Sequence, residues 1–282
     1  MQKALSDRLP PHAFFMVSAV FHYLGPAFAV LLFARLEPLG VAWLRIASAA
    51  LIFAAWRRPW RYIGGLSPAD RGRIAGLGIV LALMNCCFYE AIARLPLATV
   101  GAIEFLGPIA LAAWGMRSVR NGAALILAMG GVYLLTHLRF EGAAIAYSFA
   151  FANCGLFTLY ILLGHHIAGS GGSGGIDRLA AAMAVAMLAA LPIGIGDALP
   201  ALTSPALLFA ALGVGVSSSV IPYVCDQLAM ARLPRASFAL LLSLLPATAT
   251  LIGILVLRQM PSLADCAGIA AVVAGVGLHR EN

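Results

Sequence analysis

Long continuous runs of apolar residues are the feature that most limits how this chain can fold. A helix needs roughly 17–25 such residues to cross a hydrocarbon core of about 30 Å. Hydrophobic residues make up 62% of the chain and charged residues 10%, whereas soluble domains carry roughly 25% charged residues. The runs predict an all-α integral membrane protein with ten transmembrane helices, near 12–33, 39–56, 73–93, 97–115, 121–137, 142–164, 179–196, 205–229, 236–257 and 262–279.

Positive charge is unevenly divided between the segments that join the predicted spans. With the amino terminus in the cytoplasm, inner segments hold thirteen of the 18 Lys and Arg residues, outer turns hold four, and Arg45 lies within a span. Such an excess is typical of cytoplasmic segments. It predicts a multi-pass protein of the cell inner membrane with both termini cytoplasmic. The arginines of "RRPWRYIGGLSPADRGR" are then expected to meet anionic lipid head groups, and a nucleic-acid partner is not expected.

One junction between spans occurs twice in the sequence. "AIARLPLATVGAIEFLGP" begins at Ala91 and "AMARLPRASFALLLSLLP" begins 138 residues later, at Ala229. The copies join spans three and four and spans eight and nine, so five spans separate them and they must point in opposite directions across the membrane. This predicts two inverted five-helix repeats, residues 1–138 and 139–282, around a central cavity. Inverted repeats are common in secondary transporters, so the sequence predicts transport by alternating access.

The extended junctions also resemble a known family. "MNCCFYEAIARLPLATVGAIEFLGPIALA" and "VIPYVCDQLAMARLPRASFALLLSLLPATA" resemble the matching junctions of the drug/metabolite transporter superfamily. "WLRIASAALIF" and "LYILLG" are similar to its ten-helix, EamA-type branch of bacterial exporters, which includes exporters of threonine and homoserine and of aromatic amino acids. The resemblance covers most of the chain. It implies export of amino acids or related small metabolites through a cavity lined mainly by spans one to four and six to nine.

Glu104 is predicted near the middle of span four. Gly101, Glu104, Pro108 and Leu111 share one face of that helix. An ionisable group within a span costs roughly 2.5–3.5 kcal/mol, so it requires a role. Glu104 is a candidate to bind a substrate ammonium or a coupling proton. The alternative is a permanent ion pair with an arginine such as Arg45.

Arg45 is predicted in the outer half of span two. An arginine there could bind a substrate carboxylate with two parallel hydrogen bonds. The alternative, which the sequence favours, is a structural role, in which Arg45 reaches the interface or braces a neighbouring carboxylate.

Spans three and eight offer further polar walls. Asn85 and Tyr89 lie one turn apart on span three and supply neutral hydrogen-bonding groups suited to a zwitterion. On span eight, Pro222 removes a backbone donor and could leave a carbonyl free for a substrate, and Tyr223 follows it. Asp226 falls near the inner end of this span, where a hydrated interfacial aspartate is expected.

Spans one and six bring histidine and aromatic residues to the cavity. His22 shares a face with Ser18 and Pro26 and, because histidine changes charge between about pH 5 and 8, it is a candidate proton carrier. Phe157 and Tyr160 form a stripe on span six that is either packing or a substrate contact. Tyr160 follows His22 by 138 residues, the offset of the repeated junction. Equivalent positions of inverted repeats tend to meet, which favours both residues as part of the cavity wall. Related exporters often carry tryptophan at Phe157, which weakens the case for an indole contact there.

Four prolines within spans are candidate hinges, because kinks in helices commonly arise at proline. They are Pro26, Pro108, Pro222 and Pro246.

Other classes of protein fit less well. Lys3 is the only lysine, so no phosphate-binding loop for ATP can be built. The five cysteines lack C-x-x-C spacing, and neither a metal nor another cofactor is expected. The "GIGD" string at Gly194 to Asp197 matches membrane aspartyl proteases but lacks a second aspartate in mid-span. No enzyme activity is expected, and a membrane-embedded enzyme or a passive channel is the alternative. The expected partners are amino acids or similar metabolites and lipid, with protons as a candidate coupling ion and no obligate protein partner.

Overall fold

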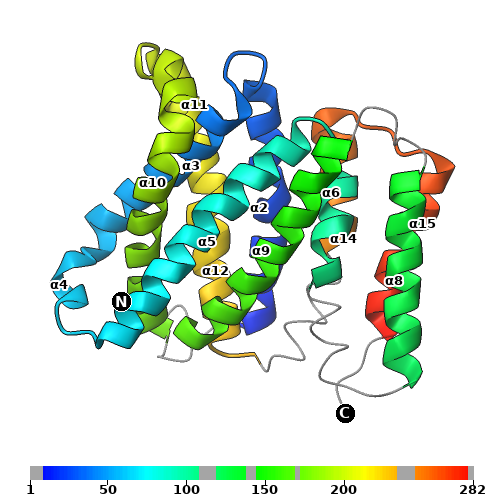
Figure 1. The fold of residues 1–282 in the computed structure, drawn as a ribbon, viewed down its shortest axis with the longest axis horizontal. Coiled ribbons are helices and arrows are strands. Elements are labelled where there is room, and N and C mark those ends of the chain that lie inside the picture. Colours follow the sequence, from blue (N-terminus) through cyan, green and yellow to red (C-terminus); the bar gives the residue numbers. More distant parts are fainter. Residues whose placement is uncertain (1–8, 108–118, 138–143, 169–171, 234–244, 279–282) are drawn as a thin grey trace.

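The computed structural model describes residues 9–107, 119–137, 144–168, 172–233 and 245–278. Regular structure within these residues is entirely helical, and the helices run alongside one another in one bundle (Figure 1). The helices are α2 (Pro11–Leu32), α3 (Pro38–Arg57), α4 (Trp60–Ile63), α5 (Pro68–Ile92), α6 (Leu97–Glu104), α8 (Val119–His137), α9 (Ala144–Ala168), α10 (Gly172–Leu202), α11 (Pro205–Gly215), the π-helix η1 (Val216–Val220), α12 (Ile221–Met230), α14 (Leu245–Leu257) and α15 (Leu263–Leu278).

Local sequence signals explain where several of these helices begin and end. Helices α2, α3, α5 and α11 each carry proline in the first turn, where its missing N–H has no intrahelical partner to lose. Ser67 caps α5, because its hydroxyl accepts a hydrogen bond from the backbone N–H of Asp70 at 3.1 Å. Helix α3 ends at Arg57, and the next residue, Arg58, caps it with a left-handed backbone at a φ of 49°.

Six helical stretches are long and apolar enough to cross a membrane. They are α2, α3, α5, α9, α10 and the continuous stretch formed by α11, η1 and α12. Helices α14 and α15 are apolar but shorter in their described parts. The prediction of a multi-pass, all-helical membrane protein is confirmed, while the count of ten spans stays a prediction.

Helix α10 differs from its prediction at both ends. The sequence predicts a span over 179–196, preceded by a flexible glycine-rich linker over Gly169 to Gly175. Instead α10 begins at Gly172 and continues through Pro192 and Pro200 to Leu202. The linker assignment is therefore wrong from Gly172 onward, and residues 169–171 lie outside the described residues. Helix α10 packs along α3 and α5, and its first turn is helical despite the low helix propensity of glycine.

Four pairs of helices pack against each other along the bundle. Helix α3 packs against α10, and α8 packs against α15 at one edge of the bundle (Figure 1). Helix α5 packs against α9, while α12 packs against α2.

Two glycines allow neighbouring helices to touch η1. A side chain at Gly25 of α2 would overlap Ser218 of η1, and one at Gly215 would meet Ser48 and the carbonyl of Arg45 on α3. Without side chains at these positions, both helices approach η1 closely. This approach brings Arg45 to the π-helix.

The candidate hinge prolines lie in different settings. Pro26 is inside α2, Pro222 is in the first turn of α12, and Pro246 is the second residue of α14. Pro108 lies outside the described residues. Hinge motion at these prolines stays a prediction.

Candidate functional site

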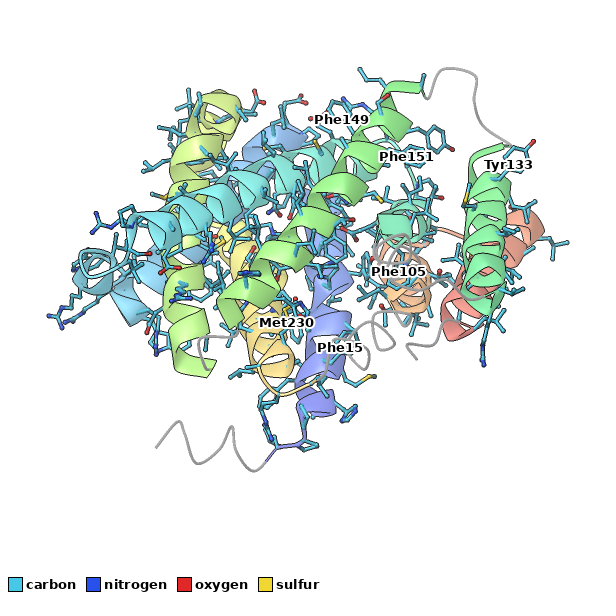
Figure 2. All side chains as sticks on the ribbon, turned by 60° about the horizontal axis from the view of Figure 1, so that its bottom comes forward. Phe15, Phe105, Tyr133, Phe149, Phe151 and Met230 are labelled. Atoms are coloured by element: carbon cyan, nitrogen blue, oxygen red, sulfur yellow. The ribbon has the colours of Figure 1, made fainter. Side chains whose placement is uncertain are left out.

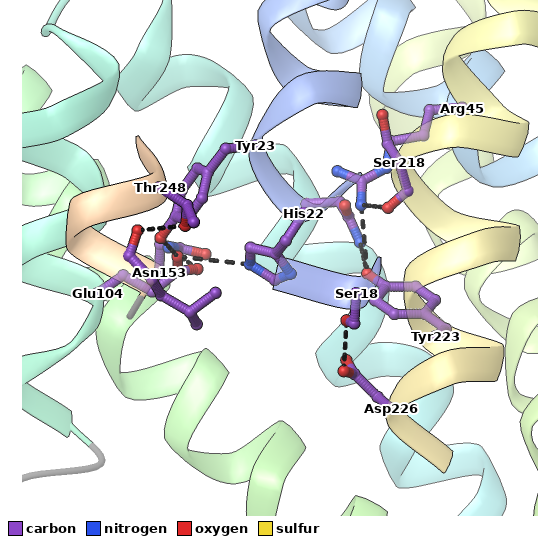
Figure 3. A network of polar contacts seen from close by, with 12 residues as sticks. Ser18, His22, Tyr23, Arg45, Glu104, Asn153, Ser218, Tyr223, Asp226 and Thr248 are labelled. Atoms are coloured by element: carbon purple, nitrogen blue, oxygen red, sulfur yellow. Dashed lines mark hydrogen bonds and ion pairs between the residues drawn. The ribbon is translucent and has the colours of Figure 1, made fainter. Parts of the chain in front are cut away.

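Buried polar side chains meet in the middle of the bundle, as Figure 3 shows. They come from helices that are far apart in the sequence, which converge around α2. The buried polar and charged residues of this group are Ser18, Arg45, Asn85, Glu104, Asn153, Ser218, Ser219, Asp226 and Gln227. In an otherwise apolar interior, such groups require partners or a ligand.

Glu104 ends α6 and is held by neutral donors. The residue is buried, with 3% of its surface exposed. The Tyr23 hydroxyl donates to Oε2 at 3.1 Å, and Nδ2 of Asn153 donates to Oε1 at 2.9 Å. Nε2 of His22 lies 3.7 Å from Oε2, close enough for an ion pair when the imidazole is protonated. The carboxylate is thus fixed in place and retains acceptor capacity, since it has about four lone-pair sites.

Arg45 of α3 is also buried, at 5% exposed, and is held mainly by η1. Its Nε donates to Oγ of Ser219 at 2.8 Å and its Nη2 to the carbonyl of Ser218 at 2.6 Å. Nη2 also lies 3.5 Å from the Tyr223 hydroxyl. The guanidinium lies 5.5 Å from the ring centre of Tyr89 and 6.0 Å from that of Tyr223, within range of cation–π attraction.

The carbonyl of Ser218 is available to Arg45 because of Pro222. In an α-helix the N–H of residue 222 would bond the carbonyl of residue 218, but proline has no N–H. The π-helix η1 immediately precedes this point, and the N–H of Ile221 bonds the carbonyl of Val216, five residues back. The structure therefore agrees with the expectation that Pro222 frees a carbonyl from the helix. This carbonyl, however, accepts a hydrogen bond from Arg45.

Arg45 and Glu104 line the same cavity without pairing. The cavity leaves about 10 Å³ for the centre of a water-sized molecule and is lined by His22, Arg45, Met84, Asn85, Phe88, Glu104, Asn153 and Tyr223. Among the described residues, no carboxylate lies within ion-pair distance of Arg45. The permanent Arg45–Glu104 pair considered from the sequence is not formed. This first cavity thus presents a guanidinium and a carboxyl group that are each held by other residues.

A second cavity lies on the other side of His22. It leaves about 10 Å³ for the centre of a water-sized molecule and is lined by Phe15, Ser18, His22, Phe157, Tyr160, Ile161, Asp226, Met230 and Leu245. Phe15 of α2 and Met230 of α12 are labelled in Figure 2. The imidazole of His22 lies 5.9 Å from the Phe157 ring, which stacks on Tyr160 at 5.9 Å. His22 lines both cavities.

Asp226 is buried in this second cavity. The sequence favours a hydrated interfacial aspartate, but Asp226 is 7% exposed and Oδ1 accepts a hydrogen bond from the Ser18 hydroxyl at 2.5 Å. The expectation is wrong because α12 packs against α2 at this level and covers the side chain. Glu90, in contrast, lines neither cavity. It forms an ion pair with Arg94, four residues later in the chain.

Most residues selected from the sequence converge here. Glu104, Arg45, Asn85, His22 and Tyr223 line the first cavity, and His22, Phe157 and Tyr160 line the second. Tyr89 is buried beside Arg45 but lines neither cavity. Asn85 and Tyr223 are equivalent at the 138-residue offset of the repeated junction. The two side chains are in contact, because Nδ2 of Asn85 lies 3.4 Å from the Tyr223 hydroxyl.

Sequence reasoning missed part of this site. Tyr23, Asn153, Ser218 and Ser219 are not among the residues selected from the sequence. A signal for Tyr23 existed, because a buried tyrosine hydroxyl generally finds a hydrogen-bond partner. Within the described residues, no three His, Cys, Asp or Glu side chains come together in a way that could hold a metal ion.

Known proteins match the chain over most of its length. No family model matches it. It is 32% identical over 269 residues to the threonine/homoserine exporter RhtA of Salmonella typhimurium strain LT2, a match that covers 91% of this chain and 88% of the relative. It is 30% identical over 257 residues to the RhtA of Escherichia coli K12, covering 89% and 84%. A solved crystal structure superposes with a TM-score of 0.62 at 16% identity, covering 95% of this chain and 96% of its own, and shows a common fold.

Proposed function

Because this chain belongs to the drug/metabolite transporter superfamily, we propose that it is a secondary transporter that exports small amino acids across the inner membrane. Threonine and homoserine are the first candidate substrates, since the relatives carry these names. Both are zwitterions, with a carboxylate and an ammonium separated by one carbon atom.

One observation carries the proposal: a buried arginine and a buried glutamate line one cavity and do not neutralise each other. Arg45 has no carboxylate partner among the described residues, although burying an unpaired charge is costly. A zwitterion would supply a carboxylate for Arg45, and its ammonium would use acceptor sites of Glu104 that Tyr23 and Asn153 leave free. Hydrogen bonds to charged groups contribute about 1.5–3 kcal/mol each, enough to favour a ligand that carries both charges.

Neutral groups around the first cavity complete the recognition. Oδ1 of Asn153 is buried without a hydrogen-bond partner while Nδ2 of the same residue is bonded to Glu104. An unused acceptor beside a carboxylate suits an ammonium, which has three donors. Asn85 and Tyr223 line the same cavity on the side of Arg45.

The inverted-repeat architecture is part of the proposal. A shift of 138 residues carries α5 onto α11–η1–α12, α2 onto α9, α3 onto α10 and most of α8 onto α15. The contact of α5 with α9 then has an image in the contact of α12 with α2, and the α3–α10 and α8–α15 contacts are images of themselves. This supports two halves, 1–138 and 139–282, that exchange conformations in alternating access across ten spans.

Counterflow in proteoliposomes tests the transport mechanism. Vesicles loaded with unlabelled threonine should accumulate labelled threonine transiently, because a transporter exchanges one molecule for the other. Glu104→Gln and Arg45→Gln should each lower this flux roughly tenfold or more, since each removes one charged partner of the substrate.

Matched controls come from charged residues outside both cavities. Glu90→Gln breaks the pair with Arg94, and Arg73→Gln breaks an exposed pair with Asp70. Both should retain flux within about twofold, as expected for changes away from a site. Flux that stays at the wild-type level in both Glu104→Gln and Arg45→Gln would reject the assigned binding site, and uptake without counterflow would indicate a channel.

Accessibility labelling tests the topology. In a cysteine-free background, single cysteines at Arg94 and Arg232 should react with impermeant reagents from opposite sides of the membrane. Arg232 should react from the cytoplasmic side, where the charge distribution places both termini. Labelling of both from one side would reject the inverted repeat.

A further inference from the structure

The second cavity combines apolar walls with one polar corner. Its apolar lining comes from α2, α9, α12 and α14, namely Phe15, Phe157, Ile161, Met230 and Leu245. Its polar corner consists of Asp226, Tyr160 and Ser18. A ligand group that fits here must be mostly apolar and must carry one hydrogen-bonding atom.

The polar corner has unused hydrogen-bonding capacity. The Tyr160 side chain is 1% exposed, and its hydroxyl approaches Asp226 without forming a hydrogen bond of normal geometry. Ser18 donates to Oδ1 of Asp226, as Figure 3 shows, and this leaves the carboxylate with further acceptor sites. A buried hydroxyl without a partner costs free energy unless a ligand completes its bonding.

A hydroxyl group matches this corner. It needs one acceptor for its proton, which Asp226 supplies, and it can accept the proton that Tyr160 offers. A methyl group of the same size could fill the apolar space but would leave the Tyr160 hydroxyl unsatisfied and Asp226 with its hydrogen bond from Ser18 alone. The corner therefore distinguishes two ligands of equal shape.

The position of the second cavity relative to the first suits an amino-acid side chain. His22 lines both cavities, and Ser18 lies one helical turn from His22, about 6 Å along α2. An amino acid with its charged groups at Arg45 and Glu104 would extend its side chain past His22 toward Asp226.

We propose that the second cavity is the side-chain subsite of the transporter, in which Asp226 and Tyr160 recognise the hydroxyl of a hydroxy amino acid. This inference rests on the proposed function, because it requires the charged groups of the substrate to occupy the first cavity. It assigns selectivity for the side chain to residues different from those that bind the charges.

The selectivity expected from such a corner is large. A hydrophobic pocket distinguishes one methyl group by only about 10- to 200-fold, whereas a site built to bond a hydroxyl rejects the analogue without it by up to about 10⁴–10⁵-fold. Threonine should therefore be transported much better than valine, which has a methyl in place of the hydroxyl. Homoserine should likewise exceed norvaline.

The test compares transport of these pairs by wild type and by two corner variants in proteoliposomes. Tyr160→Phe removes only the hydroxyl, and Asp226→Asn removes the charge at nearly constant shape. Each should lower the threonine-to-valine transport ratio by roughly tenfold or more, mainly through slower threonine transport. Tyr147→Phe is the matched control, because Tyr147 is buried on the same helix but lines neither cavity, and its ratio should equal that of wild type.

The outcomes separate the two proposals. If wild-type vesicles transport threonine and valine, and neither Tyr160→Phe nor Asp226→Asn changes the ratio, the subsite is rejected and the proposed function stands. If wild-type vesicles transport no amino acid, the proposed function fails and the subsite with it. A wild-type preference for 2,4-diaminobutyrate over homoserine would also reject the hydroxyl assignment, because it would show that Asp226 binds a cation. Size-exclusion profiles identify a variant that does not fold, in which case the other variant decides.

Discussion

Helix α5 and the stretch α11–η1–α12 occupy equivalent places in the two halves of the sequence, yet their backbones differ. Helix α5 is one uninterrupted α-helix of 25 residues. Its counterpart contains a five-residue π-helix, followed directly by Pro222 in the first turn of α12. In α5 the position equivalent to Pro222 is Met84, within a continuous ladder of backbone hydrogen bonds.

The two stretches therefore contribute to the site in different ways. Helix α5 contributes neutral side chains to the first cavity, Met84, Asn85 and Phe88, without altering its backbone. The second-half stretch instead gives up regular hydrogen bonding and uses the released carbonyl of Ser218 to hold Arg45. One half supplies a regular wall, and the other supplies backbone to bind a buried cation that a regular helix could not hold.

The largest effect is expected when proline is moved to the regular helix. Met84→Pro removes the bond from residue 84 to the carbonyl of Val80, where no π-helix and no arginine compensates. The free energy of unfolding should fall by about 3 kcal/mol or more. Thermal denaturation in detergent measures this, and a melting temperature equal to that of wild type would show that α5 and its counterpart tolerate proline alike.

A double-mutant cycle sharpens the comparison with a smaller effect. Pro222→Ala restores an N–H that can bond the carbonyl of Ser218, so this carbonyl then has a partner even without Arg45. The cost of Arg45→Met should therefore be about 1–3 kcal/mol greater in the wild-type background than in the Pro222→Ala background. Denaturation of the four proteins gives the coupling energy, and strictly additive effects would contradict the link between the missing N–H and the arginine.

The smallest effect is expected at the contact between the two stretches. Tyr223→Phe removes the acceptor of two long hydrogen bonds, from Nδ2 of Asn85 at 3.4 Å and from Nη2 of Arg45 at 3.5 Å. Asn85 keeps its bond to the Leu81 carbonyl at 2.7 Å, and Arg45 keeps its bonds to η1. Stability should change by less than about 1 kcal/mol. A loss similar to that of Met84→Pro would mean that this contact, rather than the backbone of each stretch, holds the halves together.

The helices and the presence of Glu104 and Arg45 in the interior could be predicted from the sequence. Long apolar runs determine where helices form, and a charge within such a run is rare enough to mark a site. The 138-residue offset of the repeated junction also makes His22 equivalent to Tyr160, and both residues line the second cavity. These predictions depend on local pattern and on symmetry, both of which are present in a single sequence.

Other parts could not be predicted, for physical reasons. The letters "VSSSV" do not distinguish a π-helix from an α-helix, so the sequence does not reveal the backbone partner of Arg45. Helical periodicity gives the face of a residue but not how deeply a neighbouring helix covers it, which explains the error at Asp226. The glycine-rich start of α10 is helical, although the low helix propensity of glycine predicts a linker there.

Equilibrium binding of threonine and threoninol to the purified protein tests most directly whether the unpaired charges of Arg45 and Glu104 form a zwitterion site. Threoninol keeps the ammonium and the side chain of threonine but lacks the carboxylate. Wild type should bind threonine roughly tenfold or more tightly than threoninol, and Arg45→Gln should remove this preference. Equal affinity of wild type for the two compounds would contradict the assignment of Arg45 to the substrate carboxylate.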